Sequence, residues 1–405
     1  MSFSLVHVVG AGLAGLSAAL TLVERGVGVT LIEAGPAAGG RCRSYFDREL
    51  GCRLDNGNHL LLSGNQAAFG FMEQVGSRDT LAGPGAPVFP FMDLASGERW
   101  TVRPNLGRVP WWILSPGRRV PGTRASDYLQ LARLRGAGAG ATVAETLRPG
   151  TLYRRLLEPF SISALNTMPD VASARLLWAV IDESLADGGR ACIPAYPREG
   201  LSETFVDPAL RWLEARGAEI RLSRRVSEVA RCGGRVTHLD GEKVEAVVLA
   251  VPAPVASGLV PGVAGPDAFE AIVNVHFRVE AEPGEAGFVG LVGGLAEWVF
   301  VKPGVVSTTI SAGNRFAGLE GVVLAQQVWQ EVCTVLQLTG RPPAFRVLRE
   351  KRATFAATPE QDSNRPSPLV DKNLALAGDW TATGLPATIE GAIRSGRQAA
   401  ECLLD

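Results

Sequence analysis

The first forty residues alternate between apolar runs and short glycine-rich breaks. Leu5–Val9 is an apolar run rich in β-branched residues, which is typical of a parallel strand buried on both faces. Leu16–Glu24 has the pattern of a helix, and Gly28–Ile32 is a second apolar run that ends at an acid, Glu33. The pattern therefore predicts a strand, a helix and a second parallel strand, which is the basic unit of an α/β fold.

Three glycines, Gly10, Gly12 and Gly15, occupy the turn between the first strand and the helix. Gly10 allows a tight turn, Gly12 lets the backbone approach a pyrophosphate, and Gly15 lets the helix pack closely on the strand. Glu33 lies at the distance where such a unit presents a carboxylate to a ribose. A glycine-tolerant turn in an ordinary α/β domain is the alternative, but it does not explain the acid. We favour a dinucleotide site with the pyrophosphate at the helix N-terminus.

Two further segments favour FAD over a nicotinamide cofactor. Gly39–Arg41 follows the ribose acid, where an arginine can reach the pyrophosphate from its other side as a bidentate donor. Asn373–Asp379 has the pattern of a buried strand, and we place Pro386 in the first turn of the helix that follows. Asp379 can accept a hydrogen bond from a ribityl hydroxyl, and the helix N-terminus points positive charge at a flavin ring. Both ends of the chain therefore point to one FAD site.

The α/β pattern returns near residue 200 and again near residue 350. Within these returns we expect a helix over Leu201–Arg216 and a strand over Arg225–Val229. We predict a discontinuous, Rossmann-type FAD-binding domain with an inserted α+β substrate-binding domain. The first comprises residues 1–65, 200–258 and 350–405, and the second comprises residues 66–199 and 259–349.

Composition narrows the class of function. The chain has 405 residues, a formal net charge of −1, six cysteines without metal-ligand spacing and four dispersed histidines. We therefore expect no nucleic-acid partner, no metal site and free thiols in a reducing compartment. There is no basic n-region before the first strand and no run of about 18 apolar residues. These features favour a cytoplasmic protein, soluble or peripherally attached to the inner membrane.

Two stretches in the middle of the chain carry candidate chemistry. Glu158 and Asn166 are polar residues in an apolar stretch, and they form either a hydrogen-bonded core pair or cap, or part of a greasy pocket. In such a pocket burial would raise the pKa of Glu158 and suit it to proton donation. Trp111–Leu114, which precedes Arg118 and Arg119, is either a buried loop or an anchor at a membrane interface.

The glycine fingerprint, Glu33 and Gly-Gly-Arg41 together resemble the FAD-binding amine oxidase and phytoene desaturase superfamily. Within it, the chain resembles the squalene-associated FAD-dependent desaturases, also called hydroxysqualene dehydroxylases, over nearly its whole length. The segments that carry this resemblance are Asp55–Leu62, Leu165–Thr167, Glu350–Phe355 and Leu376–Gly391. The resemblance implies reduction of hydroxysqualene to squalene and water in bacterial squalene and hopanoid synthesis. In that reaction an acid protonates the allylic hydroxyl, and reduced flavin N5 delivers a hydride.

The resemblance also implies roles for individual residues. Gly57, Asn58 and His59 become neighbours of the isoalloxazine ring, and the backbone at Val226 reads the adenine edge. The expected FAD-binding residues are Gly10, Ala11, Gly12, Leu13, Ala14, Gly15, Glu33, Ala34, Gly40, Arg41, Gly57, Asn58, His59, Val226, Gly378, Asp379, Thr388 and Ile389.

The expected substrate site is defined less closely. Glu158 is the first candidate acid and His59 the second, while Asn166 and Leu385 are expected in the substrate pocket. The expected partners are hydroxysqualene or squalene and a membrane surface contacted by Trp111–Leu114. The sequence does not identify the reductant.

Three alternatives stay open: a carotenoid-type desaturase, an amine oxidase and a flavin-free isoprenoid carrier. Leu385 and Ile389 stand where amine oxidases tend to place an aromatic residue, which argues against amines, although Trp380 offers an aromatic ring close by. A carrier predicts no tightly held flavin, yet the acids and the arginine of the FAD pattern are all present.

Overall fold

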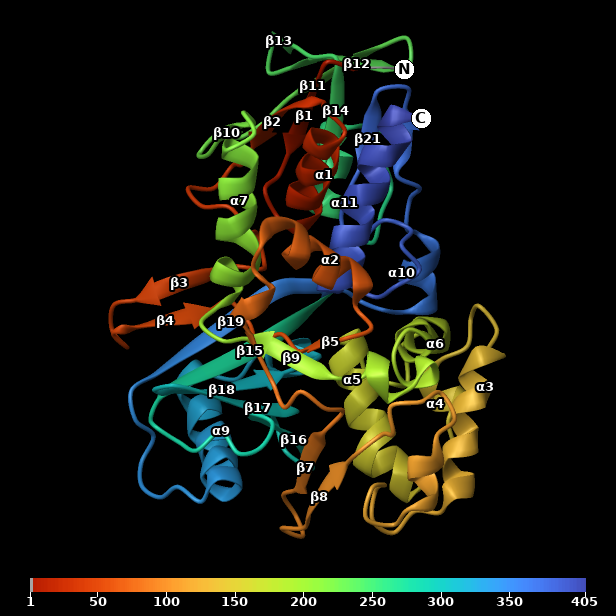
Figure 1. Cartoon of the computed structure of the whole chain (residues 1–405), viewed down its shortest axis with the longest axis vertical. Helices are drawn as coiled ribbons and strands as arrows, with labels where there is room; N and C mark the ends of the chain where they lie inside the picture. Colours follow the sequence, from red (N-terminus) through yellow and green to blue (C-terminus); the bar gives the residue numbers. More distant parts are fainter. Residues whose placement is uncertain (1–2) are drawn as a thin grey trace.

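Six strands from three separate stretches of the chain form one sheet beside the two termini (Figure 1). The structure is a computed structural model that describes residues 3–405. The strand order is β10-β2-β1-β14-β21-β20, and all neighbours are parallel except β20 with β21. The bounds are β1 Leu5–Val9, β2 Gly28–Ile32, β10 Glu219–Arg221, β14 Ala246–Leu249, β20 Leu369–Asp371 and β21 Leu374–Leu376. The central strands are continuous apolar runs because both of their faces are buried. The helices over residues 13–24 and 389–404 pack on one face, and a cluster that includes Val229, Val236 and Ala256 packs on the other. The predicted α/β fold is confirmed.

The first and last helices pack side by side on this sheet (Figure 1). They are α1, Leu13–Glu24, and α11, Ile389–Leu404. Gly396 makes the contact possible, since a Cβ built on it would lie 2.1 Å from the carbonyl oxygen of Ala14. Ser17 Oγ donates to the carbonyl of Ile393 at 2.7 Å across the same interface. The two ends of the chain are therefore held in backbone contact.

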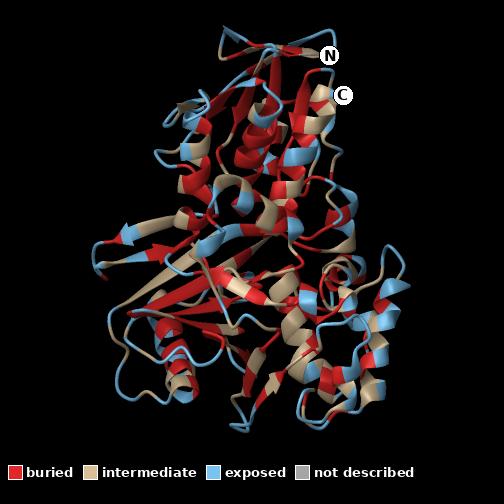
Figure 2. Ribbon diagram, viewed as in Figure 1, coloured by how far each residue is buried: buried red, intermediate tan, exposed pale blue. Residues whose placement is uncertain are grey.

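A second, mostly antiparallel sheet has seven strands in the order β19-β15-β18-β17-β16-β7-β8. The helix α9, Gly321–Leu336, packs its apolar side chains on this sheet. Buried residues follow the strands of both sheets (Figure 2). The bounds are β7 Phe89–Asp93, β8 Arg99–Val102, β15 Phe269–Arg278, β16 Phe288–Val292, β17 Trp298–Lys302, β18 Val305–Ile310 and β19 Phe345–Phe355.

Four helices form a lobe at the end of the molecule far from the termini (Figure 1). They are α3 Leu131–Arg135, α4 Val143–Thr146, α5 Glu158–Leu165 and α6 Ala174–Asp182. The remaining helices are α2 Gln66–Val75, α7 Asp207–Glu214, α8 Ala253–Leu259 and α10 Pro359–Ser363. The remaining strands are β3 Ser44–Asp47, β4 Cys52–Asp55, β5 Leu61–Leu62, β6 Leu81–Ala82, β9 Pro194–Pro197, β11 Val229–Cys232, β12 Arg235–Leu239 and β13 Glu242–Lys243. Within residues 3–405, no helix has both the length and the apolar character needed to cross a bilayer.

Two π-helical turns interrupt helices where the sequence places a proline. Tyr153–Leu157 precedes Pro159, and Ser202–Val206 precedes Pro208. Proline has no N–H to donate and its ring crowds the carbonyl four residues earlier, so the preceding turn widens. The helix predicted over Leu201–Arg216 is therefore a π-turn followed by α7.

Two other predicted boundaries are wrong. The segment Arg225–Val229 is irregular, and its strand begins only at Val229, because Asp240 Oδ1 accepts the N–H groups of Ser227 and Glu228. Pro386 lies outside α11, which begins at Ile389, because the side chain of Thr388 caps the helix by accepting from Gly391 N.

The division into two domains stays a proposal. The three stretches that we assign to the FAD-binding domain supply the strands of the six-stranded sheet. The strand β19 crosses the proposed boundary at residue 350 and pairs with β15 in the other sheet.

We predict that Gly396→Ala lowers the free energy of unfolding by about 1–3 kcal/mol, because the added methyl group overpacks the contact between α1 and α11. Gly70→Ala in α2 is the matched control, since a Cβ there meets no atom within 4 Å. Thermal unfolding measures both variants. Equal unfolding temperatures would show that the two terminal helices do not pack this closely.

Candidate functional site

The glycine turn leaves the N-terminus of α1 open. Gly10 has φ +103°, and a Cβ on Gly15 would lie 1.8 Å from the carbonyl oxygen of Gly10, so both positions require glycine. By contrast, a Cβ on Gly12 would meet nothing within 4 Å. Gly12 is the N-cap of α1, and no side chain caps the helix there. Uncapped N–H groups beside open space suit a pyrophosphate, so this end of the helix fits the expected group.

Glu33 faces the same turn from the end of β2. Its carboxylate accepts from Ala11 N at 2.9 Å and from Gly35 N at 2.7 Å, which fixes its position beside the fingerprint. The carbonyl of Glu33 accepts from Arg224 N at 2.8 Å, which holds the segment that leads to Val226 alongside. The structure therefore brings together the acid and the backbone that the sequence predicts at the adenosine half of FAD.

Arg41 and Asp379 form an ion pair that joins the two ends of the chain. Arg41 Nη2 lies 2.7 Å from Asp379 Oδ1, and Arg41 Nη1 donates to the carbonyl of Ala353. Gly39 N donates to the carbonyl of Ala11 at 2.7 Å, so the loop that carries Arg41 lies against the glycine turn. The Arg41 loop and the Asp379 turn, which the sequence analysis singles out at opposite ends of the chain, therefore lie together.

The segment predicted beside the flavin ring is held by polar contacts from the second sheet. Asn58 Nδ2 donates to Thr309 Oγ1 at 3.1 Å, and Thr309 Oγ1 donates to Asn274 Oδ1 at 3.0 Å. The Asn274 side chain packs against Gly57, where a Cβ would lie 3.2 Å from its Nδ2. Asn274 and Thr309 are missed by the sequence analysis, because their strands carry no signal other than apolar alternation.

His59 is arranged as a neutral imidazole. Its Nδ1 lies 3.1 Å from the carbonyl oxygen of Gly57, which can only accept, so Nδ1 carries the proton and Nε2 does not. Burial lowers the pKa of His59, and the hydrogen bond to Gly57 only partly opposes this. The only proton of the second candidate acid is therefore held in the hydrogen bond to Gly57.

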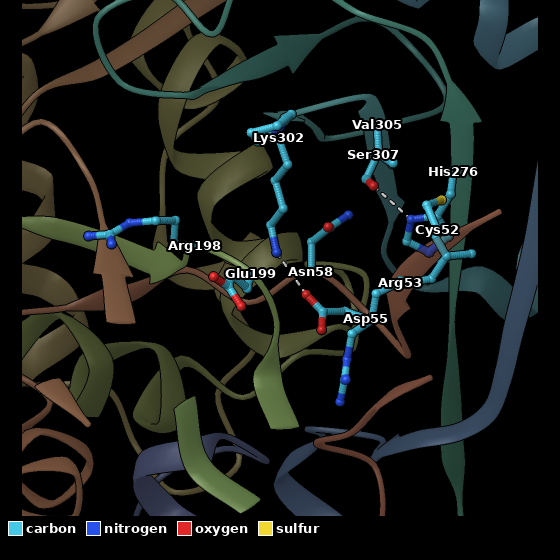
Figure 3. Close-up of a pocket in the computed structure, with 12 residues that line it drawn as sticks. Cys52, Arg53, Asp55, Asn58, Arg198, Glu199, His276, Lys302, Val305 and Ser307 are labelled. Carbon is cyan, nitrogen blue, oxygen red and sulfur yellow. Dashed lines mark hydrogen bonds and ion pairs between the residues drawn. The ribbon is translucent and has the colours of Figure 1, made fainter. Parts of the chain in front are cut away.

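A polar pocket of about 230 Å³ opens beside Asn58 (Figure 3). Lys302 Nζ lies 2.8 Å from Asp55 Oδ2 within it, and Asp55 Oδ1 also accepts from Ser44 Oγ and Leu201 N. The saturated carboxylate ties β4 to β17 and to the start of the helix near residue 201. The charged lining does not suit a hydrocarbon chain, so we assign the pocket no substrate.

Glu158 lies at the start of α5 with a free carboxyl group. The side chain is half-buried, and burial raises the pKa of Glu158 above its ordinary value. Among residues 3–405, no hydrogen bond or ion pair engages the carboxylate. A carboxyl group in this state keeps its proton to a higher pH than an exposed one.

Asn166 ends α5 and ties it to Ala312 and Thr354. It adopts φ +48°, its Oδ1 accepts from Ala312 N at 2.7 Å, and its Nδ2 donates to Thr354 Oγ1 at 2.9 Å. Thr354 follows Ala353, whose carbonyl binds Arg41. Asn166 is buried and its amide is engaged through both its oxygen and its nitrogen, which fixes the end of α5; its expected place in the substrate pocket stays a prediction. Glu158 lies about 12 Å along the helix from this attachment.

Glu297 is a second buried acid, which the sequence analysis does not single out. Burial raises the pKa of Glu297 to about 7. However, its Oε1 pairs with Arg315 at 2.8 Å and its Oε2 accepts from Ser311 N at 2.7 Å. Because both oxygens are engaged, Glu297 supports the strand ends, whereas the carboxyl group of Glu158 is free.

The residues of the last motif are largely packed. Leu385 and Ile389 are buried, and so is Trp380, whose Nε1 donates to the carbonyl of Val251 at 2.9 Å. Gly378 N donates to Ser395 Oγ at 2.8 Å, which fixes the turn before Asp379 against α11. The ring of Trp380, which left an amine oxidase as an alternative in the sequence analysis, is thus part of a core.

Comparison with known proteins identifies the family. The family model described as "Flavin containing amine oxidoreductase" matches residues 13–282 and 297–404. The chain belongs to this family. It is an FAD-dependent oxidoreductase, and the expected cofactor is confirmed; the role of each individual residue stays a prediction.

Two relatives narrow this assignment, and one solved structure shows the same fold. The chain is 45% identical to hydroxysqualene dehydroxylase of Sinorhizobium fredii and 44% identical to that of Rhodopseudomonas palustris, with 98% of both chains covered in each case. It therefore belongs to the hydroxysqualene dehydroxylase family, as the sequence resemblance predicts. Cyclohexylamine oxidase from Brevibacterium oxydans has the same fold, with a TM-score of 0.73, 16% identity and 99% of both chains covered.

We predict that Arg41→Gln weakens FAD binding by about ten- to a hundredfold, because charge-assisted hydrogen bonds contribute roughly 1.5–3 kcal/mol. Arg43→Gln is the control, since Arg43 is exposed two residues away. Flavin retained after gel filtration and titration of the apoprotein measure the effect. Equal retention by the two variants would remove Arg41 from the cofactor site.

Proposed function

We propose that this protein reduces hydroxysqualene to squalene and water. The observation that carries the proposal is the identity of 42–45% over nearly the full length with three proteins named hydroxysqualene dehydroxylase. The free carboxyl group of Glu158 supports it, because removal of an allylic hydroxyl needs a proton donor.

Glu158 donates its proton to the hydroxyl oxygen, and the carbon–oxygen bond breaks with release of water. Bound FAD, in its reduced form, supplies the hydride that replaces the hydroxyl group. Glu158 then regains a proton from solvent, so each turnover consumes one hydride and one proton. His59 does not compete as the donor, because the Gly57 carbonyl holds its only proton on Nδ1.

The partial burial of Glu158 supports the proposed reaction, because it favours the protonated carboxyl group by disfavouring the charged form. The reaction also requires that water be excluded from the allylic cation that remains when the hydroxyl leaves. A charged lining would trap the cation or ionise the acid, which is why the pocket beside Lys302 is not the reaction site.

We predict that Glu158→Gln slows squalene formation by roughly 10²- to 10⁴-fold while FAD stays bound, the range for loss of a general acid. Asp170→Asn is the control, an exposed acid of the same lobe. The raised pKa of Glu158 also fixes the pH dependence, since the acid form is active. The single-turnover rate of the wild type falls as the pH rises through that pKa. The rate of the Glu158→Gln variant does not show this fall. Undiminished turnover of the variant would exclude Glu158.

We further propose that the protein works in the cytoplasm at the inner membrane, with the Trp111–Leu114 turn at the bilayer. At ~0.8 kcal/mol per buried CH₂, a thirty-carbon substrate gains on the order of 20 kcal/mol on leaving water, so it resides in the bilayer. Trp111 is 66% exposed and Leu114 59%. Trp112 is only 3% exposed and packs edge-on against Tyr128, so it holds the turn and does not insert.

We predict that Trp111→Ser combined with Leu114→Ser reduces binding to liposomes at least tenfold, because two apolar side chains no longer enter the interface. Phe46→Ser is the matched control, since Phe46 is 65% exposed in the β3–β4 hairpin. Flotation measures both. If the double variant and the control float alike, the turn is not the anchor.

A further inference from the structure

The overall charge of the chain conceals a strongly basic segment. Residues 103–155 contain ten arginines, no lysine and two acids, Asp127 and Glu145, which gives a formal net charge of +8. The whole chain carries −1, so the remainder carries −9. The segment includes α3 and α4, in the lobe far from the termini (Figure 1).

Most of these arginines have no acidic partner. Arg103, Arg108 and Arg155 pair with acids from outside the segment. Seven others form no ion pair within the described part of the chain, and all but Arg119 are exposed. They are Arg118, Arg119, Arg124, Arg133, Arg135, Arg148 and Arg154. Repulsion among so many unpaired cations costs stability, which indicates that a partner compensates them.

The same segment displays apolar side chains in water. Of the twelve large hydrophobic residues exposed in residues 3–405, five lie here: Leu106, Val109, Trp111, Leu114 and Leu129. The loop that carries the first four is fixed by Asn105. Its Nδ2 donates to the carbonyls of Gly107 and Val109, and its Oδ1 accepts from Trp112 N. Arg119 Nη1 donates to the carbonyl of Ile113, so cation and apolar loop are adjacent.

We infer that residues 103–155 form a docking surface for a bilayer of anionic phospholipid. Arginine binds phosphate oxygens through paired N–H groups, while exposed tryptophan and leucine enter the interface below the headgroups. An acidic protein would neutralise the arginines, but it would not explain why five large apolar side chains are exposed. The inference rests on the proposed function, since an apolar substrate must be taken from a membrane.

This orientation also places the reaction site. The segment ends within the π-turn Tyr153–Leu157, which leads directly to Glu158. A bilayer seated on the lobe is therefore adjacent to the helix that carries the proposed acid. Substrate passes from the bilayer to that helix without crossing the polar pocket at Lys302.

The test uses flotation of the purified holoprotein with vesicles of phosphatidylcholine alone or equimolar phosphatidylcholine and phosphatidylglycerol. We expect much tighter binding to the anionic vesicles, weakened by added salt. Each arginine removed lowers the affinity for anionic vesicles about fivefold, so a variant with Arg124→Gln, Arg135→Gln and Arg148→Gln binds them on the order of a hundredfold more weakly. A control with Arg25→Gln, Arg48→Gln and Arg397→Gln removes the same charge elsewhere and binds like the wild type.

Equal binding to both kinds of vesicle, or equal losses in the two triple variants, would overturn the inference. Weak binding to anionic vesicles would also overturn the inference, and an acidic protein would then be the better candidate partner for the arginines. Squalene formation from detergent-dispersed hydroxysqualene separates this from the proposed function. If the docking inference holds, the Arg124, Arg135 and Arg148 variant forms squalene in detergent at the wild-type rate. If the proposed function is wrong, neither the wild type nor any variant forms squalene, and the flotation results are unaffected.

Discussion

The ion pair between Arg41 and Asp379 is the contact on which the site depends. It joins a loop after the second strand to a turn before the last helix, which are at opposite ends of the sequence. Gly396 allows α1 and α11 to touch, and this contact brings both segments to one place. Arg41 also binds Ala353, and the next residue, Thr354, binds Asn166 at the end of α5. One arginine thus joins the two ends that are predicted to bind FAD and, through Ala353 and Thr354, the helix with the proposed acid.

The environment of each titratable group decides its role. Glu158 and Glu297 are both raised in pKa by burial, but Glu297 is bonded through both oxygens and Glu158 through neither. His59 is lowered in pKa, and a backbone carbonyl holds its proton. Residue type alone does not separate these three candidates. The combination of desolvation with a free carboxyl group favours Glu158.

The fold and the cofactor were largely predictable, because their signals are local. The first strand, the glycine turn and Glu33 occupy one short stretch, and each residue acts on its immediate neighbours. The contacts of Asn166 are not predictable from its own segment, because its partners, Ala312 and Thr354, come from distant parts of the chain. Trp111 is exposed and Trp112 is buried, because Trp112 packs against Tyr128. No pattern in their own segment reveals this difference. The basic character of residues 103–155 does not show in the net charge of −1, because that value sums over the whole chain.

The central claim is that the joined ends hold one FAD whose reduced form converts an allylic alcohol to an alkene product. Anaerobic mixing of the fully reduced holoprotein with hydroxysqualene tests it most directly. The account predicts that the flavin absorbance returns and that one squalene forms for each flavin reoxidised. Flavin that stays reduced, or that reoxidises without squalene, would contradict it.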